Sequence, residues 1–175
     1  MTAPGRTRVV VTDATVLINL IHVGRLDLLG SLRGYEFVVP PEVEAEVSVP
    51  AQAAALDRAF GAGHIARACF TGTAEVEVYA QLVQVIGKGE AACLAMAEVQ
   101  GWCVASDERR KFLRLAGERL GPGRVMNTAG IFVLAIRAGL LSVEEADNDK
   151  RALEGRRFKM PFSSFRDVLE TGNKE

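Results

Sequence analysis

Residues 9–13 read Val-Val-Val-Thr-Asp, and this stretch decides the fold. A run of β-branched residues is typical of a strand that is buried on both faces of a parallel sheet. The stretch Trp-Cys-Val-Ala-Ser-Asp at 102–107 ends in the same way, with an aspartate directly after an apolar run. Because ligands bind outside the carboxyl ends of parallel strands, Asp13 and Asp107 are predicted to meet at one edge of the sheet.

Strand-like and helical patterns alternate along the rest of the chain. A third buried strand is predicted at 37–39, and short strands are predicted at 65–70 and 124–126. Helices are predicted at 14–23, 25–32, 41–47, 51–60, 75–86, 90–99, 109–119, 127–138 and 143–153. This alternation predicts an α/β fold of three layers, α/β/α, around a central, mostly parallel sheet of four or five strands.

The length of 175 residues fits one domain. We expect an N-terminal tail at 1–7, a domain at 8–142 and a C-terminal helical extension at 143–175 that packs on the same domain. A hydrophobic content of 49% with 25% charged residues is typical of a soluble globular protein. The net charge of -1 excludes a global basic field, so a nucleic-acid partner would need a local basic patch.

The sequence favours a cytoplasmic protein with no membrane segment. It contains neither the apolar run of about 20 residues that a membrane helix needs nor a signal-peptide pattern at its start. Its three cysteines, Cys69, Cys93 and Cys103, are odd in number and lack metal-ligand spacing. They are predicted to be buried free thiols, which favours a reducing compartment.

Two further acids, Glu46 and Glu90, also stand near predicted helix ends. Each of the four acids has a purely structural alternative: Asp13 and Asp107 could cap helices, Glu90 could complement a helix dipole, and Glu46 could be solvated. Glu90 precedes an almost wholly apolar helix, however, so its charge would need a partner such as Lys88, or a metal. Converging carboxylates raise one another's pKa unless a cation lies among them, and their oxygens suit Mg²⁺ or Mn²⁺.

Several stretches share their order and spacing with one known family. They are Val11-Thr12-Asp13-Ala14-Thr15 with its continuation to Leu20, residues 39–47, residues 89–97, residues 105–110, and residues 127–131 leading to 138–141. On these stretches the chain resembles PIN-domain ribonucleases, close to the VapC-type toxins and their solitary relatives. The resemblance covers roughly residues 8–142 and implies a PIN-like fold.

The resemblance also implies the roles of individual residues. The acids that would hold the metal and carry catalysis are Asp13, Glu46, Glu90 and Asp107, and Thr128 would orient them. Thr128 could equally cap its own helix, and either Glu44 or Glu108 could take the role of a neighbouring acid. For Asn19, a buried side-chain hydrogen bond is the preferred interpretation.

The activity implied by the resemblance is cleavage of RNA by a water that Mg²⁺ or Mn²⁺ activates, leaving 5′-phosphate and 3′-hydroxyl ends. No histidine is needed, and His22 and His64 are predicted to be structural. Basic clusters at 109–124 and 150–159 could bind phosphates, with Arg109 and Arg110 nearest the acids, although a solvated helix face is the alternative. VapC-type relatives further imply a homodimer and a cognate antitoxin protein as partner.

Two other classes of protein also place an acid after the first strand, but the sequence fits them less well. A phosphoaspartate hydrolase needs a second acid two residues after the first, where Thr15 stands, and the acids of a receiver domain follow a different order. The serious alternative is a PIN-like module that binds RNA or protein without cutting it.

Overall fold

A computed structural model describes residues 5–172 of the chain. Its strands are β1 (Arg8–Thr12), β2 (Tyr35–Val39), β3 (Ala66–Arg67), β4 (Cys103–Ala105) and β5 (Val125–Met126). They form one five-stranded sheet in the order β3-β2-β1-β4-β5, and every neighbouring pair is parallel. The predicted α/β fold is therefore confirmed.

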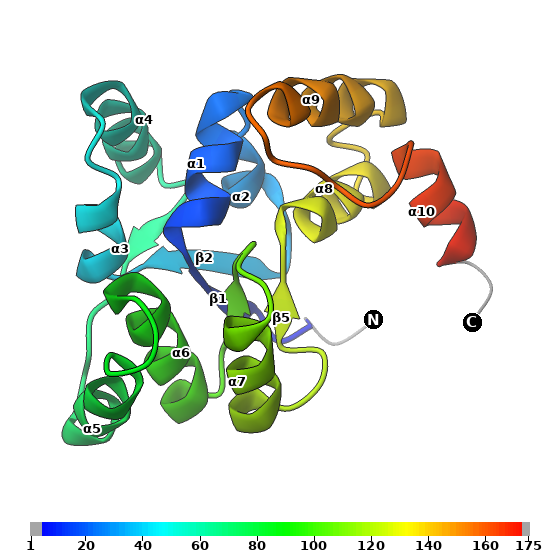
Figure 1. Cartoon of the computed structure of the whole chain (residues 1–175). Coiled ribbons are helices and arrows are strands. Elements are labelled where there is room, and N and C mark those ends of the chain that lie inside the picture. The colour runs from blue at the N-terminus through cyan, green and yellow to red at the C-terminus, as the bar shows by residue number, and fades with distance from the viewer. Residues whose placement is uncertain (1–4, 173–175) are drawn as a thin grey trace.

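Helices cover both faces of the sheet and complete the three layers. They are α1 (Ala14–His22), α2 (Asp27–Ser31), α3 (Pro41–Glu46), α4 (Pro50–Gly61), α5 (Thr73–Leu82), α6 (Lys88–Gln100), α7 (Lys111–Leu120), α8 (Thr128–Arg137), α9 (Val143–Gly155) and α10 (Phe165–Thr171). Figure 1 shows α1, α2, α4, α8, α9 and α10 above the sheet and α5, α6 and α7 below it.

The core forms around the central strand β1 and the helix α6. Val10 and Val11 are fully buried, as the β-branched run predicts. All residues from Ala91 to Ala97 are buried as well, so α6 is the deeply buried helix that its composition predicts. Its small side chains let it lie close to the sheet, which places the start of α6 beside the carboxyl ends of the strands.

The C-terminal helices pack on α8. The ring of Phe165 in α10 meets the ring of Phe132 in α8 edge to face, with centroids 5.6 Å apart. Asp147 in α9 caps α10, since its two oxygens accept hydrogen bonds from the Ser164 hydroxyl at 2.7 Å and the Phe165 amide at 2.9 Å. The division at 142/143 stays a prediction, and residues 1–4 of the predicted tail and 173–175 of the extension lie outside the described residues.

Most helices begin or end one or two residues from their predicted bounds, and the largest difference is at the end of the helix predicted at 75–86. The helix predicted at 75–86 ends at Leu82, and the β-branched residues that follow form turns, in keeping with their lower helix propensity. The helix predicted from residue 109 begins at Lys111, because Arg110 adopts a φ of 48°, outside the helical region. Within residues 5–172 no helix combines the length and the hydropathy that a membrane-spanning segment requires.

Candidate metal and nucleic-acid site

The acids gather where the strand order reverses, between β1 and β4. Thr12 at the end of β1 pairs with Ala105 at the end of β4, and the Asp13 amide donates to the Ala105 carbonyl at 2.9 Å. Asp13 and Asp107 therefore leave the sheet at the same edge. In open α/β sheets this reversal point opens a crevice, and ligands bind there.

Asp13 is the most deeply buried of the four predicted metal ligands, with 2% of its surface exposed. Its Oδ2 accepts hydrogen bonds from the hydroxyls of Thr15 at 2.9 Å and Ser106 at 3.3 Å. Burial raises the pKa of Asp13, although these hydroxyls and the amides of Ala14 and Thr15 oppose the rise. Asp13 makes no side-chain cap on α1, so the capping role considered for it is not seen.

Asp107 is held through both of its carboxylate oxygens. Oδ1 accepts from the Thr128 amide at 2.9 Å, and Oδ2 accepts from the Thr128 hydroxyl at 2.5 Å and from Asn19 Nδ2 at 2.9 Å. The amide of Asp107 donates to the Thr15 hydroxyl at 3.2 Å. Asn19 thus makes a side-chain hydrogen bond, while the cap on α8 comes from Asn127 rather than from Thr128.

Glu46 reaches the cluster from the last residue of α3. Its Oε1 accepts a hydrogen bond from the Gly89 amide at 2.9 Å, although the residue as a whole is exposed. A Cβ built on Gly89 would lie 2.6 Å from that oxygen, so only glycine allows this approach. Burial of the carboxyl raises the pKa of Glu46, and the charge of Asp13 adds to the rise.

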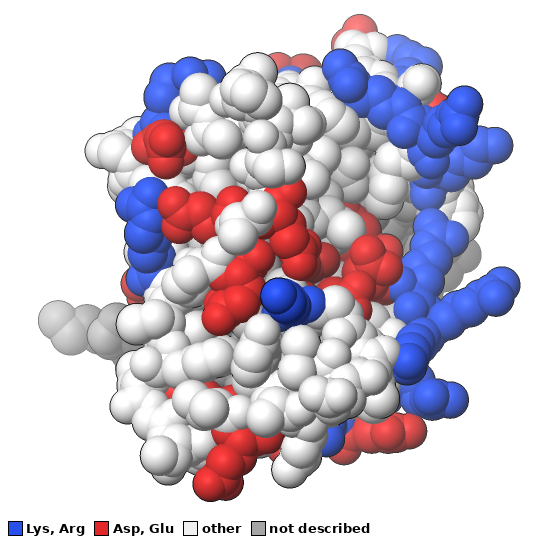
Figure 2. All heavy atoms as spheres, turned by 60° about the vertical axis from the view of Figure 1, so that its left-hand side comes forward, with Lys and Arg blue, Asp and Glu red and all other residues white. Residues whose placement is uncertain are grey.

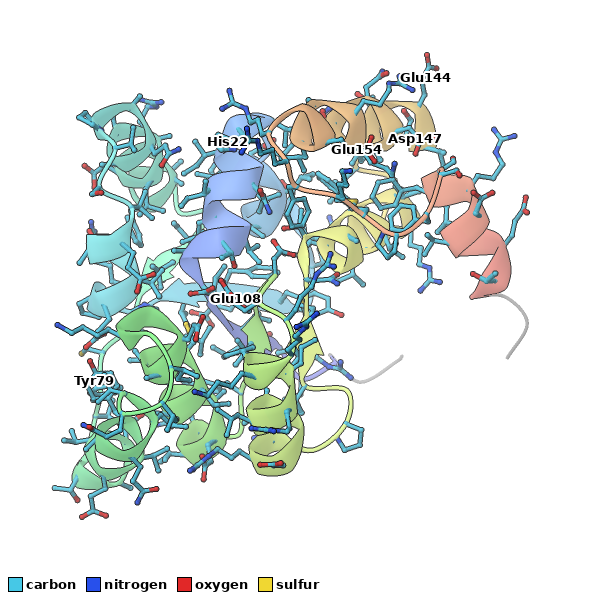
Figure 3. All side chains as sticks on the ribbon, viewed as in Figure 1. His22, Tyr79, Glu108, Glu144, Asp147 and Glu154 are labelled. Atoms are coloured by element: carbon cyan, nitrogen blue, oxygen red, sulfur yellow. The ribbon has the colours of Figure 1, made fainter. Side chains whose placement is uncertain are left out.

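Glu90 and Glu108 are the remaining acids at this edge of the sheet. Burial raises the pKa of Glu90, the charges of Glu108, Asp13 and Glu46 raise it further, and the Gly87 amide opposes the rise. Burial also raises the pKa of Glu108, with added repulsion from Asp13, Asp107 and Glu46. Acids from four segments of the chain thus lie close enough together for the charges of some to raise the pKa of others. Figure 3 labels Glu108 near the middle of the molecule, between the two helical layers.

We call Asp13, Glu46, Glu90, Asp107 and Glu108 the acidic cluster. In the described part of the chain, no lysine or arginine forms an ion pair with any of the five, so Lys88 does not pair with Glu90. Figure 2 shows acidic side chains gathered in the middle of one face. Among residues 5–172, no three of the ionisable groups lie close enough together to form a ready ligand set for a metal.

The thiols lie in different surroundings. Cys93 in α6 is fully buried, and its burial, together with the nearby charges of Asp13, Glu46 and other acids, raises its pKa well above the usual value. Cys103 is buried too, but Cys69 is exposed, so the prediction that all three are buried is wrong. Cys69 lies two residues after β3, the edge strand of the sheet.

Part of the predicted basic surface has a structural role. Arg119 pairs with Glu98 at 2.9 Å, and Arg124 donates to backbone carbonyls, among them that of Ala97. Lys150 is buried and pairs with Glu154. The cations that stay exposed are Arg109, Arg110, Lys111, Arg114, Arg151, Arg156, Arg157 and Lys159. In Figure 2, lysines and arginines form a band along one edge of the face that carries the acids.

The two predicted phosphate-binding arginines differ in position. Arg109 lines a pocket that Asp107 and Glu108 also line, whereas Arg110 precedes α7 and does not line it. The sequence reasoning gave no role to Thr15, Ser106 or Gly89, which position the acids. The sequence does contain signals for these roles. Thr15 and Ser106 lie one or two residues from the strand-end aspartates, and Gly89 directly precedes Glu90.

Comparison with known proteins agrees with this geometry. A search of curated protein sequences found no match. The model of the family DUF3368, described as a PIN domain, matches residues 9–171. This range contains all ten helices of the described region and the whole sheet, apart from the first residue of β1. PIN domains are commonly nucleases that use divalent metals. The chain belongs to this family of PIN domains.

Proposed function

We propose that the protein is an endoribonuclease that depends on Mg²⁺ or Mn²⁺ and cuts RNA phosphodiester bonds. One observation carries the proposal: Asp13, Glu46, Glu90, Asp107 and Glu108 come together near the reversal point of a parallel sheet, and in the described part of the chain no lysine or arginine forms an ion pair with any of them. Such crowding is unfavourable unless a bound cation offsets it.

The donor atoms fit a hard divalent cation. Carboxylate oxygens are the ligands that Mg²⁺ and Mn²⁺ prefer, and Asp13, Glu46, Glu90 and Asp107 would hold the ion, with Glu108 close enough to take part. When bound, the cation supplies an activated water and neutralises charge at the scissile phosphate. Thr128 and Asn19 fix the orientation of Asp107, as partners of metal ligands commonly do.

RNA would be held by the exposed cations beside the acids. Arg109 is the nearest candidate because it lines the same pocket as Asp107 and Glu108. Arg110, Lys111 and Arg114 are exposed in the segment that follows. Contacts of this kind to phosphates are independent of sequence and weaken as salt rises.

A cleavage assay tests the proposal directly. Purified wild type and Asp13→Asn are incubated with labelled single-stranded RNA in Mg²⁺, in Mn²⁺ and in EDTA. We expect cleavage only with a metal, and at least about a 100-fold loss in Asp13→Asn, since even partners of metal ligands are worth 10- to 100-fold. Asp27→Asn, an exposed acid in α2, is the matched control and should cut normally. RNA binding without products would instead identify a silent PIN module.

The biological setting is part of the same proposal. The resemblance to VapC-type toxins supports a cytoplasmic toxin, or a solitary relative, that forms a homodimer and is covered by an antitoxin. Induced expression of wild type and Asp13→Asn, followed by sequencing of transcript 5′ ends, would reveal the RNA that is cut. Light scattering on the purified protein would give its oligomeric state.

A further inference from the structure

A pocket of about 530 Å³ opens beside the acidic cluster. Its near end is formed by Ser106, Asp107 and Glu108, and Ser106 is the same residue whose hydroxyl donates to Asp13. Its volume falls within the range of roughly 300–1,000 Å³ typical of sites for small ligands. A group bound there would lie directly next to the proposed cleavage centre.

The far wall comes from a distant part of the sequence. Residues 158–161 belong to the connection between α9 and α10, which runs back toward α1 and passes α8 in Figure 1. Arg109 Nη2 donates to the carbonyl of Lys159 at 3.2 Å and so joins this connection to the start of α7. The C-terminal helices therefore do more than cover the sheet, because the segment between them encloses the pocket.

The lining combines an apolar surface with positive charge. Leu113, Met126, Phe158 and Met160 are among the apolar residues of the lining, whose surface as a whole is mainly apolar. The cations Arg109 and Lys159 line the same pocket. Phe158 is the aromatic residue of the lining, and it is only partly buried.

This chemistry suits one unit of a nucleic-acid strand. A nucleobase offers a flat apolar face to an aromatic ring, and its flanking phosphates need cations nearby. We propose that the pocket holds one unpaired base of the RNA substrate next to the scissile phosphate, so that the enzyme selects single-stranded positions. A base that is stacked and paired in a duplex could not enter. The proposal rests on the proposed nuclease function. Continuity of the pocket with the acids favours RNA over a protein segment as occupant.

An abasic scan of the substrate tests the pocket. Labelled single-stranded RNAs of one sequence carry an abasic ribose at one position at a time, and kcat/KM is measured for each. For wild type we expect a loss of roughly 5- to 100-fold at one position beside the cut, the value of one stacked base. In Phe158→Ala this penalty should disappear, and Phe158→Trp, which keeps an aromatic face, should restore it.

Phe70 provides the matched control, because it is also partly buried but packs against Tyr79 at a tilt, with centroids 5.3 Å apart, and does not line the pocket. Tyr79 is labelled in Figure 3 far from Glu108. Phe70→Ala should keep the full abasic penalty. The proposal is overturned if no position is sensitive in wild type, the result expected for a pocket that binds a protein segment. It is overturned equally if Phe158→Ala keeps the penalty while its melting temperature is normal.

The same scan also separates this proposal from the nuclease proposal. Binding of each RNA to Asp13→Asn is measured by fluorescence anisotropy in Ca²⁺, without any cleavage. If wild type cuts nothing but one abasic position still weakens binding, and Phe158→Ala removes that effect, the pocket stands and only the nuclease assignment fails.

Discussion

Thr128 holds Asp107 with two hydrogen bonds from one residue, one from its amide to Oδ1 at 2.9 Å and one from its hydroxyl to Oδ2 at 2.5 Å. The hydroxyl is fully buried, since no surface of Thr128 is exposed. An arrangement of this kind fixes the carboxylate before any ligand arrives. It also makes Thr128 a positioning residue whose effect can be separated from that of the acid itself.

The first prediction concerns this hydroxyl. Thr128→Val keeps the shape of the side chain and the hydrogen bond from the backbone amide but removes the hydroxyl. The Asp107 carboxylate therefore loses one of the three hydrogen bonds that it accepts. We expect RNA cleavage to fall roughly 10- to 100-fold and Mn²⁺ affinity, measured by calorimetry, to fall with it. The unfolding free energy should fall by about 1.5–3 kcal/mol, the value of a hydrogen bond to a charged group. Thr128→Ser, which keeps the donor, should retain most of the activity, and equal loss in both variants would contradict this role.

The second prediction concerns Gly89. In Gly89→Ala the new Cβ would lie within 3 Å of the Glu46 carboxyl, which is the flexible end of a side chain and can move away. We therefore expect little change in stability without metal but a loss of metal-dependent stabilisation and of cleavage. Gly87→Ala, at the N-cap of the same helix α6, is the control, because its Cβ would meet only an ordinary contact, 3.9 Å from the Glu90 carboxyl carbon. Melting curves with and without Mn²⁺ distinguish the two variants.

The third prediction concerns pH. Folding raises the pKa of Asp13, Glu46, Glu90 and Glu108, so the folded protein binds protons more tightly than the unfolded chain at these sites. These groups stabilise the folded protein most at pH values below the ordinary glutamate pKa of about 4.5, and this stabilisation is lost as the pH rises through the raised pKa values. Mg²⁺ should therefore raise the melting temperature more at pH 7 than near pH 4.5.

An isosteric substitution gives the same test at constant pH. Glu90→Gln removes one charge from the acidic cluster while its amide oxygen can still accept from Gly87, so without metal the melting temperature should rise. Cleavage should fall in the same variant. Glu77→Gln, on the exposed surface of α5, is the control and should change neither quantity. A lower melting temperature for metal-free Glu90→Gln would show that the repulsion is not significant.

The fourth prediction concerns packing away from the site. A Cβ on Gly30 in α2 would lie 2.7 Å from the backbone Cα of His64, which cannot move away cheaply. We expect Gly30→Ala to destabilise the protein by about 1–3 kcal/mol despite the better helix propensity of alanine. Gly117→Ala in α7, where a Cβ meets open space, should instead stabilise by about 0.5–1 kcal/mol. Urea unfolding of both variants measures the difference, and a stabilised Gly30→Ala would contradict the predicted clash.

The layout of the fold could be predicted from the sequence because local signals agree with the global arrangement. The β-branched run at 9–12 and the aspartate after it already indicate a buried parallel strand and a strand-end acid. The apolar helix at 90–99 likewise indicates burial. The helix ends could not be predicted to the residue. The turn after Leu82 and the positive φ of Arg110 arise from local backbone conformation, which apolar periodicity does not reveal.

The site could be predicted only in part. Acids that follow a strand can be recognised in the sequence, and in the structure Asp13, Glu46 and Glu90 are close enough for their charges to affect a neighbour's pKa, as Asp107 is to Glu108. Their role as metal ligands stays a prediction. The contact between Gly89 and Glu46 spans 43 residues, and the bond from Arg109 to Lys159 spans 50. Contacts between segments so far apart leave no periodic pattern in the sequence. The wall formed by residues 158–161 was therefore not foreseen.

The position of that wall also sets an order of events during synthesis. A nascent chain that has emerged as far as Arg137 carries every acid of the cluster together with Thr128, yet it lacks the loop that encloses the neighbouring pocket. The growing polypeptide therefore contains its acidic centre before the proposed base-binding pocket is complete, and that pocket is complete only after Pro161 has been synthesised.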